Sequence, residues 1–156
     1  MKTATLTVNK EDVMQEVDKT ASYTGKKIDE ATPPADGQET AYDRIRTTAA
    51  TEELLKRFWD EAASIATSKM MRFLTSVEND TAYTAQLSLT ERWDDTLLPG
   101  MNKSLFSYFV SFVLSRWFKI ANKAEAETET YMADANDLLE DVMRKLYFRS
   151  SPVRDI

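Results

Sequence analysis

The residues best suited to chemistry in this sequence are three acids near its middle. Glu91 precedes the adjacent pair Asp94 and Asp95, and carboxylates of this kind can bind a divalent cation. The regular D-x-D-x-D-G spacing of a calcium-binding loop is absent, and adjacent aspartates at the end of a strand are typical of a solvated turn. We therefore predict no metal site, and a metal-dependent enzyme that uses carboxylates is kept only as a remote alternative.

Acidic residues are also concentrated in the last predicted helix, from about Ala124 to Phe148. Two carboxylates perform acid–base chemistry only when they face each other across a pocket, whereas the spacing here scatters them over the outer face of a helix. The pattern favours a solvated or partner-facing surface. The residues concerned are Glu125, Glu127, Glu129, Asp134, Asp137, Glu140 and Asp141.

The sequence contains neither histidine nor cysteine. The absence of histidine excludes serine triads, Cys–His dyads and imidazole metal sites. The absence of cysteine excludes disulfides, thiolate nucleophiles and Cys-ligated zinc. The glycines, Gly25, Gly37 and Gly100, cannot form a phosphate-binding loop. We predict no catalytic residue, no cofactor and no metal, and we expect the protein not to be an enzyme.

Charge and hydropathy restrict the partners. A formal net charge of −6 disfavours a broad nucleic-acid-binding surface. The most apolar stretch, LFSYFVSFVLSRWF at residues 105–118, is a poor membrane segment. Its longest uncharged run, from Ser104 to Ser115, has 12 residues, and a span needs about 20. The opening residues MKTATLTVNKED contain no apolar segment, so we predict no signal peptide.

The same stretch is predicted to be a helix that is apolar most of the way round, and such a helix is surrounded by protein. One interpretation is ordinary core filling. The other is an interface with another copy, because aromatic residues concentrate at interfaces. Phe109 and Trp117 are the residues that we expect to pack there.

Alternation of polar and apolar residues predicts two short strands, at residues 3–8 and 83–90. A two-stranded ribbon is marginal by itself, and the strands could pair with each other or across subunits. The sequence leaves both pairings open.

Apolar spacing and capping residues predict the helices. Asn9 is expected to cap the first, which ends near Gly25. A short helix is expected to begin at Asp36, and Thr51 precedes a long one. Pro99-Gly100 either breaks the chain or lies in the first turn of the next helix. The long helices are predicted over residues 52 to about 77, from Met101 to about Asn122, and from about Ala124 to Phe148.

The length of 156 residues is that of one ordinary domain. We predict a mainly α (α+β) fold, in which a bundle of three to four helices is combined with two short strands. The single domain would cover residues 1–156, with a flexible loop at 29–40 and an extended C-terminal tail at 149–156.

The end of the chain is basic. From Arg144 to Arg154 the sequence has four basic residues and no acidic one. Basic side chains in the last turn of a helix suit its dipole, which is one interpretation. The other is a docking tail whose arginines form bidentate pairs with an acidic partner. We predict partner docking through Arg149, Pro152 and Arg154.

Several elements occur together over residues 83–154. The alternating strand YTAQLSLTERW comes first, and an apolar helix ending in Arg116-Trp117-Phe118 is followed by the turn Ala121-Asn122. An acidic helix with an early tyrosine, Tyr131, leads to the basic terminus LYFRSSPVR. This succession resembles small helical proteins of tailed phages, of the head–tail connector or adaptor type found in the neck of phages and prophages of gut Bacteroidetes. The first 50 residues hardly contribute.

The resemblance implies a structural virion protein that is assembled in the cytoplasm of the bacterial host. Identical subunits, twelve in number, would form an oligomeric ring between the portal and the tail. The expected partners are other copies of the chain, the portal protein, and tail or neck proteins, with no membrane. DNA would pass through the channel without specific binding. The alternatives are a tail-completion or other phage accessory protein, and a bacterial cytoplasmic helical adaptor.

Overall fold

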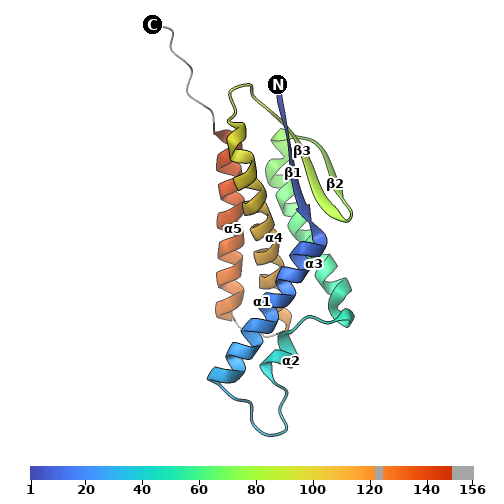
Figure 1. Ribbon diagram of the computed structural model, residues 1–156, viewed down its shortest axis with the longest axis vertical. Coiled ribbons are helices and arrows are strands. Elements are labelled where there is room, and N and C mark those ends of the chain that lie inside the picture. Colours follow the sequence, from blue (N-terminus) through green and yellow to red (C-terminus); the bar gives the residue numbers. More distant parts are fainter. Residues whose placement is uncertain (122–124, 149–156) are drawn as a thin grey trace.

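The computed structural model describes residues 1–121 and 125–148. It is an elongated molecule in which a small antiparallel sheet lies against one half of a helical bundle (Figure 1). This architecture confirms the predicted mainly α, α+β fold. The strands are β1 (Lys2–Asn9), β2 (Leu74–Asn79) and β3 (Ala82–Leu89), and the helices are α1 (Lys10–Ala31), α2 (Ala41–Ile45), α3 (Glu52–Met70), α4 (Leu98–Ala121) and α5 (Glu125–Tyr147).

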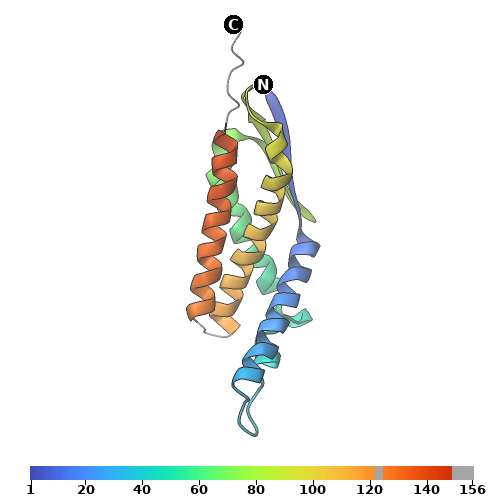
Figure 2. The same ribbon diagram turned by 60° about the vertical axis from the view of Figure 1, so that its left-hand side comes forward.

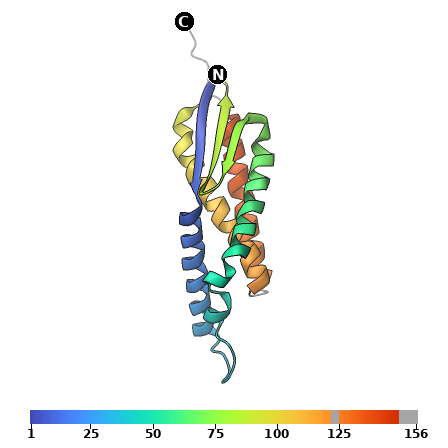
Figure 3. The same ribbon diagram turned by 90° about the vertical axis from the view of Figure 1, so that its right-hand side faces the viewer.

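The two strands predicted from the sequence pair with each other inside one chain. The strand order is β1-β3-β2, and β1 runs antiparallel to β3 with Leu6 opposite Ala85 (Figure 3). The residues of β1 alternate between a buried and a solvated face, and Ala4, Leu6 and Val8 point into the core. The register therefore follows from the apolar pattern, because a slip by one residue would expose this face.

The third strand, β2, corrects the prediction of a helix over residues 52–77. The helix α3 ends at Met70, a short 3₁₀ helix follows at Met71–Phe73 (η2), and the chain then extends into β2. Phe73 and Val77 have helical spacing, but pairing with β3 determines the structure of this segment. Thr75 and Val77 are β-branched residues that favour the extended backbone.

The first helix is longer than predicted. It begins with the expected Asn9 cap, whose side chain accepts from the Asp12 amide, but it continues past Gly25 to Ala31. Gly25 does not end the helix. It allows the backbone of α2 to pack closely against α1, because an added Cβ at this position would lie 2.6 Å from the Cα of Tyr42. The helix α2 starts at Ala41 after a Thr40 cap and not at Asp36, and the predicted 29–40 loop is reduced to residues 32–40.

The second half of α1, the 32–40 loop and α2 together form a projection that we call the arm. It extends beyond the ends of α4 and α5 (Figure 2). Asp29 ties α2 to α1, since its carboxylate accepts from the amides of Ala41 at 2.7 Å and Tyr42 at 3.0 Å.

The apolar stretch at 105–118 lies in α4, which packs against α5, α3, α1 and the sheet. Pro99 and Gly100 lie in its first turn, as one of the two predicted alternatives requires. Three indole N–H groups connect distant segments to this core. Trp59 donates to Asn79 Oδ1 at 2.7 Å, Trp93 to the Lys145 carbonyl at 2.9 Å, and Trp117 to the Ile45 carbonyl at 2.5 Å.

Candidate docking surface

The three acids considered for metal binding are each engaged separately. Asp94 accepts from the amide and the hydroxyl of Thr96, at 3.0 and 2.6 Å, and caps a short 3₁₀ helix at Asp95–Leu97. These hydrogen bonds lower the pKa of its carboxyl. Glu91 lies 2.6 Å from the ammonium of Met1. Over the ranges 1–121 and 125–148, no three acidic side chains gather closely enough to hold a metal ion.

A hydroxyl, a carboxylate and an amine meet between α4 and α5. Asp141 Oδ2 accepts from Ser104 Oγ and from Lys145 Nζ, both at 2.9 Å. The hydrogen bond from Lys145 is the main cause of the lowered pKa of Asp141. A serine nucleophile needs a neighbouring base that can take its proton. The neighbour of Ser104 is the carboxylate of Asp141, and its lowered pKa makes it a weaker base than an ordinary aspartate. The cluster therefore links two helices and does not activate Ser104.

The acidic residues of α5 are spread over its outer face. Glu129, Asp134, Asp137 and Glu140 are exposed, and Asp141 is the member that turns toward α4. No opposed pair of carboxylates forms here among the residues that the structure describes. The predicted solvated or partner-facing surface agrees with this placement.

The predicted interface residues, Phe109 and Trp117, are buried within the chain itself. Phe109 stacks on Trp59 with ring centroids 4.3 Å apart and lies 5.3 Å from the ring of Tyr83. Both side chains therefore fill the core, which was the other interpretation of the apolar helix, and a single copy offers neither to a partner. The predicted docking residues Arg149, Pro152 and Arg154 lie outside the described residues.

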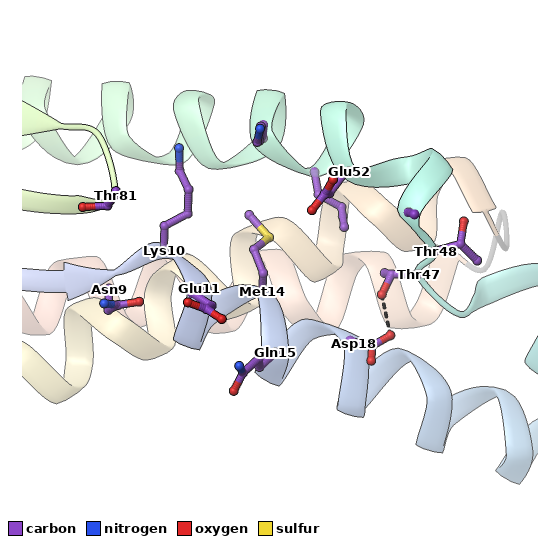
Figure 4. Close-up of a pocket in the computed structure, with 13 residues that line it drawn as sticks. Asn9, Lys10, Glu11, Met14, Gln15, Asp18, Thr47, Thr48, Glu52 and Thr81 are labelled. Atoms are coloured by element: carbon purple, nitrogen blue, oxygen red, sulfur yellow. Dashed lines mark hydrogen bonds between the residues drawn. The ribbon is translucent and has the colours of Figure 1, made fainter.

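A surface groove lies between the first half of α1 and the start of α3, with a volume of about 590 Å³ (Figure 4). Met14 and Leu55 provide its apolar lining, and a hydrogen bond from Thr47 to Asp18 crosses one end. The ammonium of Lys10 lies over the ring of Trp59, 5.6 Å from its centroid. Charges of both signs line this groove without converging on one point, so it indicates no particular ligand.

β1 begins, and α3 and α5 end, at the same end of the molecule (Figures 1 and 2), and these segments carry exposed apolar side chains. Met1 is 80 % exposed, Met71 65 %, Tyr147 52 % and Phe148 51 %. Phe73 packs edge-on against Tyr147, with ring centroids 5.0 Å apart. We call these five residues the end cluster.

A small groove opens within the end cluster, with a volume of about 190 Å³. The buried side chains of Leu89 and Leu146 line it together with Met1, Phe73 and Tyr147. Arg72 also lines the groove, and its guanidinium lies 5.9 Å from the centre of the Tyr147 ring. We call this cavity the end groove.

Sequence analysis missed the end cluster because its members come from three separate parts of the chain. Met71 and Phe73 were assigned to the last turns of a helix predicted over residues 52 to about 77, and nothing in their spacing places them beside Met1 or Tyr147. Their meeting depends on where α3 stops and β2 begins. The only local signal was the run Leu146-Tyr147-Phe148, which continues an apolar pattern past the last buried turn of α5.

Comparisons with known protein families, with curated proteins and with solved structures found no match to this chain. Among the described helices, none is both long enough and apolar enough to cross a membrane. The functional argument therefore depends on the geometry of the chain itself.

Proposed function

We propose that this chain is a structural, non-enzymatic subunit of a phage virion: a head–tail connector that forms a ring between portal and tail. The observation that supports this proposal is the end cluster, where four apolar side chains are each more than half exposed at one end of the molecule. Apolar side chains gathered on a surface are typical of protein–protein contacts.

One member of the end cluster adjoins the predicted docking residues in the sequence. Phe148 is a member of the cluster and directly precedes the segment that contains Arg149, Pro152 and Arg154. In this proposal the cluster supplies the apolar part of a contact with the next copy or with the portal, and the arginines supply its charged part. A contact between two different surfaces of identical copies produces a ring when the rotation closes.

Burial of the end cluster would contribute part of the free energy that such a contact needs. Fully burying one apolar side chain of this size contributes about 1.5–3 kcal/mol, and four are exposed here. Association itself costs on the order of 4–15 kcal/mol in lost freedom of motion. The cluster offsets a substantial part of this cost, and the remainder would come from the arginines and from repetition around the ring.

The acidic face of α5 supports the part of the proposal that concerns DNA. Asp134, Asp137 and Glu140 are exposed along one helix, and a surface of this charge repels phosphates. Placed toward the channel, it would let DNA pass without binding.

The experiment is size-exclusion chromatography with light scattering over a wide range of protein concentration. The parent chain should grow from monomer to a closed oligomer, whereas the double variant Met71→Ser, Tyr147→Ser should stay monomeric. Tyr23→Ser is the matched control, because Tyr23 is 62 % exposed but lies in the arm, and it should assemble like the parent. A parent chain that stays monomeric throughout, or a double variant that assembles as well as the parent, would overturn the proposal.

A further inference from the structure

We propose that, in the free chain, the end groove is the docking site of the chain's own residues 149–156, with Val153 as the residue that enters it. In this arrangement the segment occupies the end groove and lies over part of the end cluster. The inference concerns the chain before assembly and holds whether or not the chain is a connector.

The size of the groove suits side chains of a peptide. Its volume of about 190 Å³ corresponds to roughly six waters at about 30 Å³ each. Pockets for cofactors and drug-sized ligands are larger, at about 300–1,000 Å³. One or two apolar side chains fill a space of this size, and Pro152-Val153 is the apolar pair that the segment offers.

The charges around the groove match those that follow Val153. Arg72 lines the groove. Glu91 follows the lining residue Thr90 and holds the ammonium of Met1 at 2.6 Å. The rim therefore carries one side chain of each sign, and the segment continues from Val153 with Arg154 and Asp155, also one of each sign. Asp155 can pair with Arg72, and Arg154 can share the Glu91 carboxylate with the ammonium of Met1.

Chain length favours the chain's own segment over that of another copy. Leu146 and Tyr147 line the groove, and Val153 is separated from Tyr147 by six peptide links, which span at most about 20 Å. Ser150, Ser151 and Pro152 are residues that form turns readily, so the chain can reverse toward the groove. Attachment by so short a link gives an effective concentration in the millimolar range, well above ordinary concentrations of a second copy.

The absence of cysteine from the sequence permits a direct test in the full-length chain. The variant Val153→Cys, Thr90→Cys places one thiol on the segment and one on the groove. In a glutathione buffer, the effective concentration of this pair should exceed that of the control Val153→Cys, Arg144→Cys by about tenfold or more. Arg144 is exposed and lies only 9 residues before Val153 along the chain, but it does not line the groove.

The products of oxidation separate the possible occupants. A monomeric disulfide in the Thr90 pair, with a much weaker one in the Arg144 pair, supports the proposal. Equal values for the two pairs overturn it. Disulfide-linked dimers whose yield rises with concentration also overturn it, and they would assign the groove to the segment of a neighbouring copy.

A variant without cysteine gives an independent measurement. Val153→Asp should release the segment, because a carboxylate is not accommodated among Leu89, Leu146 and Phe73. Binding of a fluorescent apolar dye to the uncovered cluster should rise several-fold, while Val153→Ile should leave it unchanged. An Asp variant that binds no more dye than the parent would contradict the assignment.

Discussion

The arm and the end cluster both expose aromatic rings, but the two regions differ in how far basic side chains cover their apolar surface. In the arm, Tyr42 lies under two cations, Lys26 at 5.3 Å and Arg46 at 5.4 Å from the ring centroid, and Lys27 lies 5.3 Å from the ring of Tyr23. Long basic side chains of this kind cover apolar surface with their stems and keep their charge in water. At the end cluster, Tyr147 has Arg72 at 5.9 Å, while Phe148, Met1 and Met71 remain more than half exposed.

This difference indicates which end is built to remain in solvent. An aromatic ring beneath a lysine is already partly desolvated, so a partner gains little by covering it. Exposed methionine and phenylalanine side chains gain transfer free energy in proportion to the area that a partner covers, and the flexible thioethers of Met1 and Met71 adapt to the shape of a partner. Tyr23 and Tyr147 are alike in this respect, since each has a cation near its ring, and the contrast between the two ends rests on Met1, Met71 and Phe148.

The largest effect is expected for a substitution that loosens the attachment of the arm to the bundle. Trp117 is buried, and its indole N–H holds the carbonyl of Ile45. Trp117→Ala should lower the free energy of unfolding by about 3–5 kcal/mol, because it leaves a cavity and an unpaired carbonyl. Phe148→Ala, a truncation at the exposed end cluster, should change it by no more than about 0.5 kcal/mol. Urea unfolding followed by circular dichroism measures both, and similar losses for the two variants would refute this contrast.

A smaller difference in stability is expected between alanine substitutions at two glycines, Gly25 in α1 and Gly100 in the first turn of α4. Gly25→Ala would place a Cβ 2.6 Å from the backbone of Tyr42, and such overpacking costs about 1–3 kcal/mol. At Gly100 the nearest atom to an added Cβ is Lys145 Nζ at 3.3 Å, the end of a flexible side chain that can move. Gly100→Ala should therefore change stability by less than about 0.5 kcal/mol. Thermal unfolding compares the pair, and a tolerated Gly25→Ala would show that α2 can move away from α1.

The smallest effect on stability concerns the carboxylate of Asp141, whose hydrogen bond from Ser104 links α4 to α5. The pKa of Asp141 is lowered chiefly by its hydrogen bond from Lys145. As the pH falls, Asp141 is therefore protonated in the unfolded chain before it is protonated in the folded one. The ionised carboxylate stabilises the fold at pH values above its ordinary pKa. This contribution is lost as the pH falls through the lowered pKa of the folded state. The pair is partly exposed, so Asp141→Asn should cost at most about 1 kcal/mol at pH 7.

The matching measurement is the difference in stability between the parent chain and Asp141→Asn at pH 7 and at pH 3. This difference should shrink at the lower pH, where the unfolded parent chain has begun to protonate Asp141 and the contribution of the ionised carboxylate is being lost. In a Lys145→Met background the difference should be smaller at both values. A difference that stays constant with pH would mean that the carboxylate gains nothing from Lys145.

The sequence predicted the elements whose pattern is set locally. The alternation in β1 and β3, the Asn9 cap, and the apolar stripes of α4 and α5 were all recognised, because burial on one face imposes a period on the residues. The predicted end of α3 was wrong because the spacing of Phe73 and Val77 is compatible with a helix as well as with the 3₁₀ helix η2 and the strand β2 in which they lie. The end of α1 was wrong because Gly25 makes room for Tyr42, a residue 17 positions later, and a single sequence contains no sign of that approach.

The candidate docking surface was the least predictable part. Phe109 and Trp117 were selected because they are aromatic, but composition cannot tell a ring that fills the core from one that faces outward. The end cluster depends on three chain segments meeting at one end. The charged segment with Arg149, Pro152 and Arg154 stays a prediction.

The pairing of β1 with β3 also sets an order for events during synthesis. Lys2 lies opposite Leu89, so the first strand leaves the ribosome about 90 residues before its partner, a wait of roughly 5–18 s at about 5–20 residues per second. During this wait Ala4, Leu6 and Val8 have no sheet to cover them, and the threonines that alternate with them keep the nascent strand hydrated. Maturation of the sheet must therefore follow translation of the hairpin, and a chaperone that recognises short apolar strands would find its substrate in this interval.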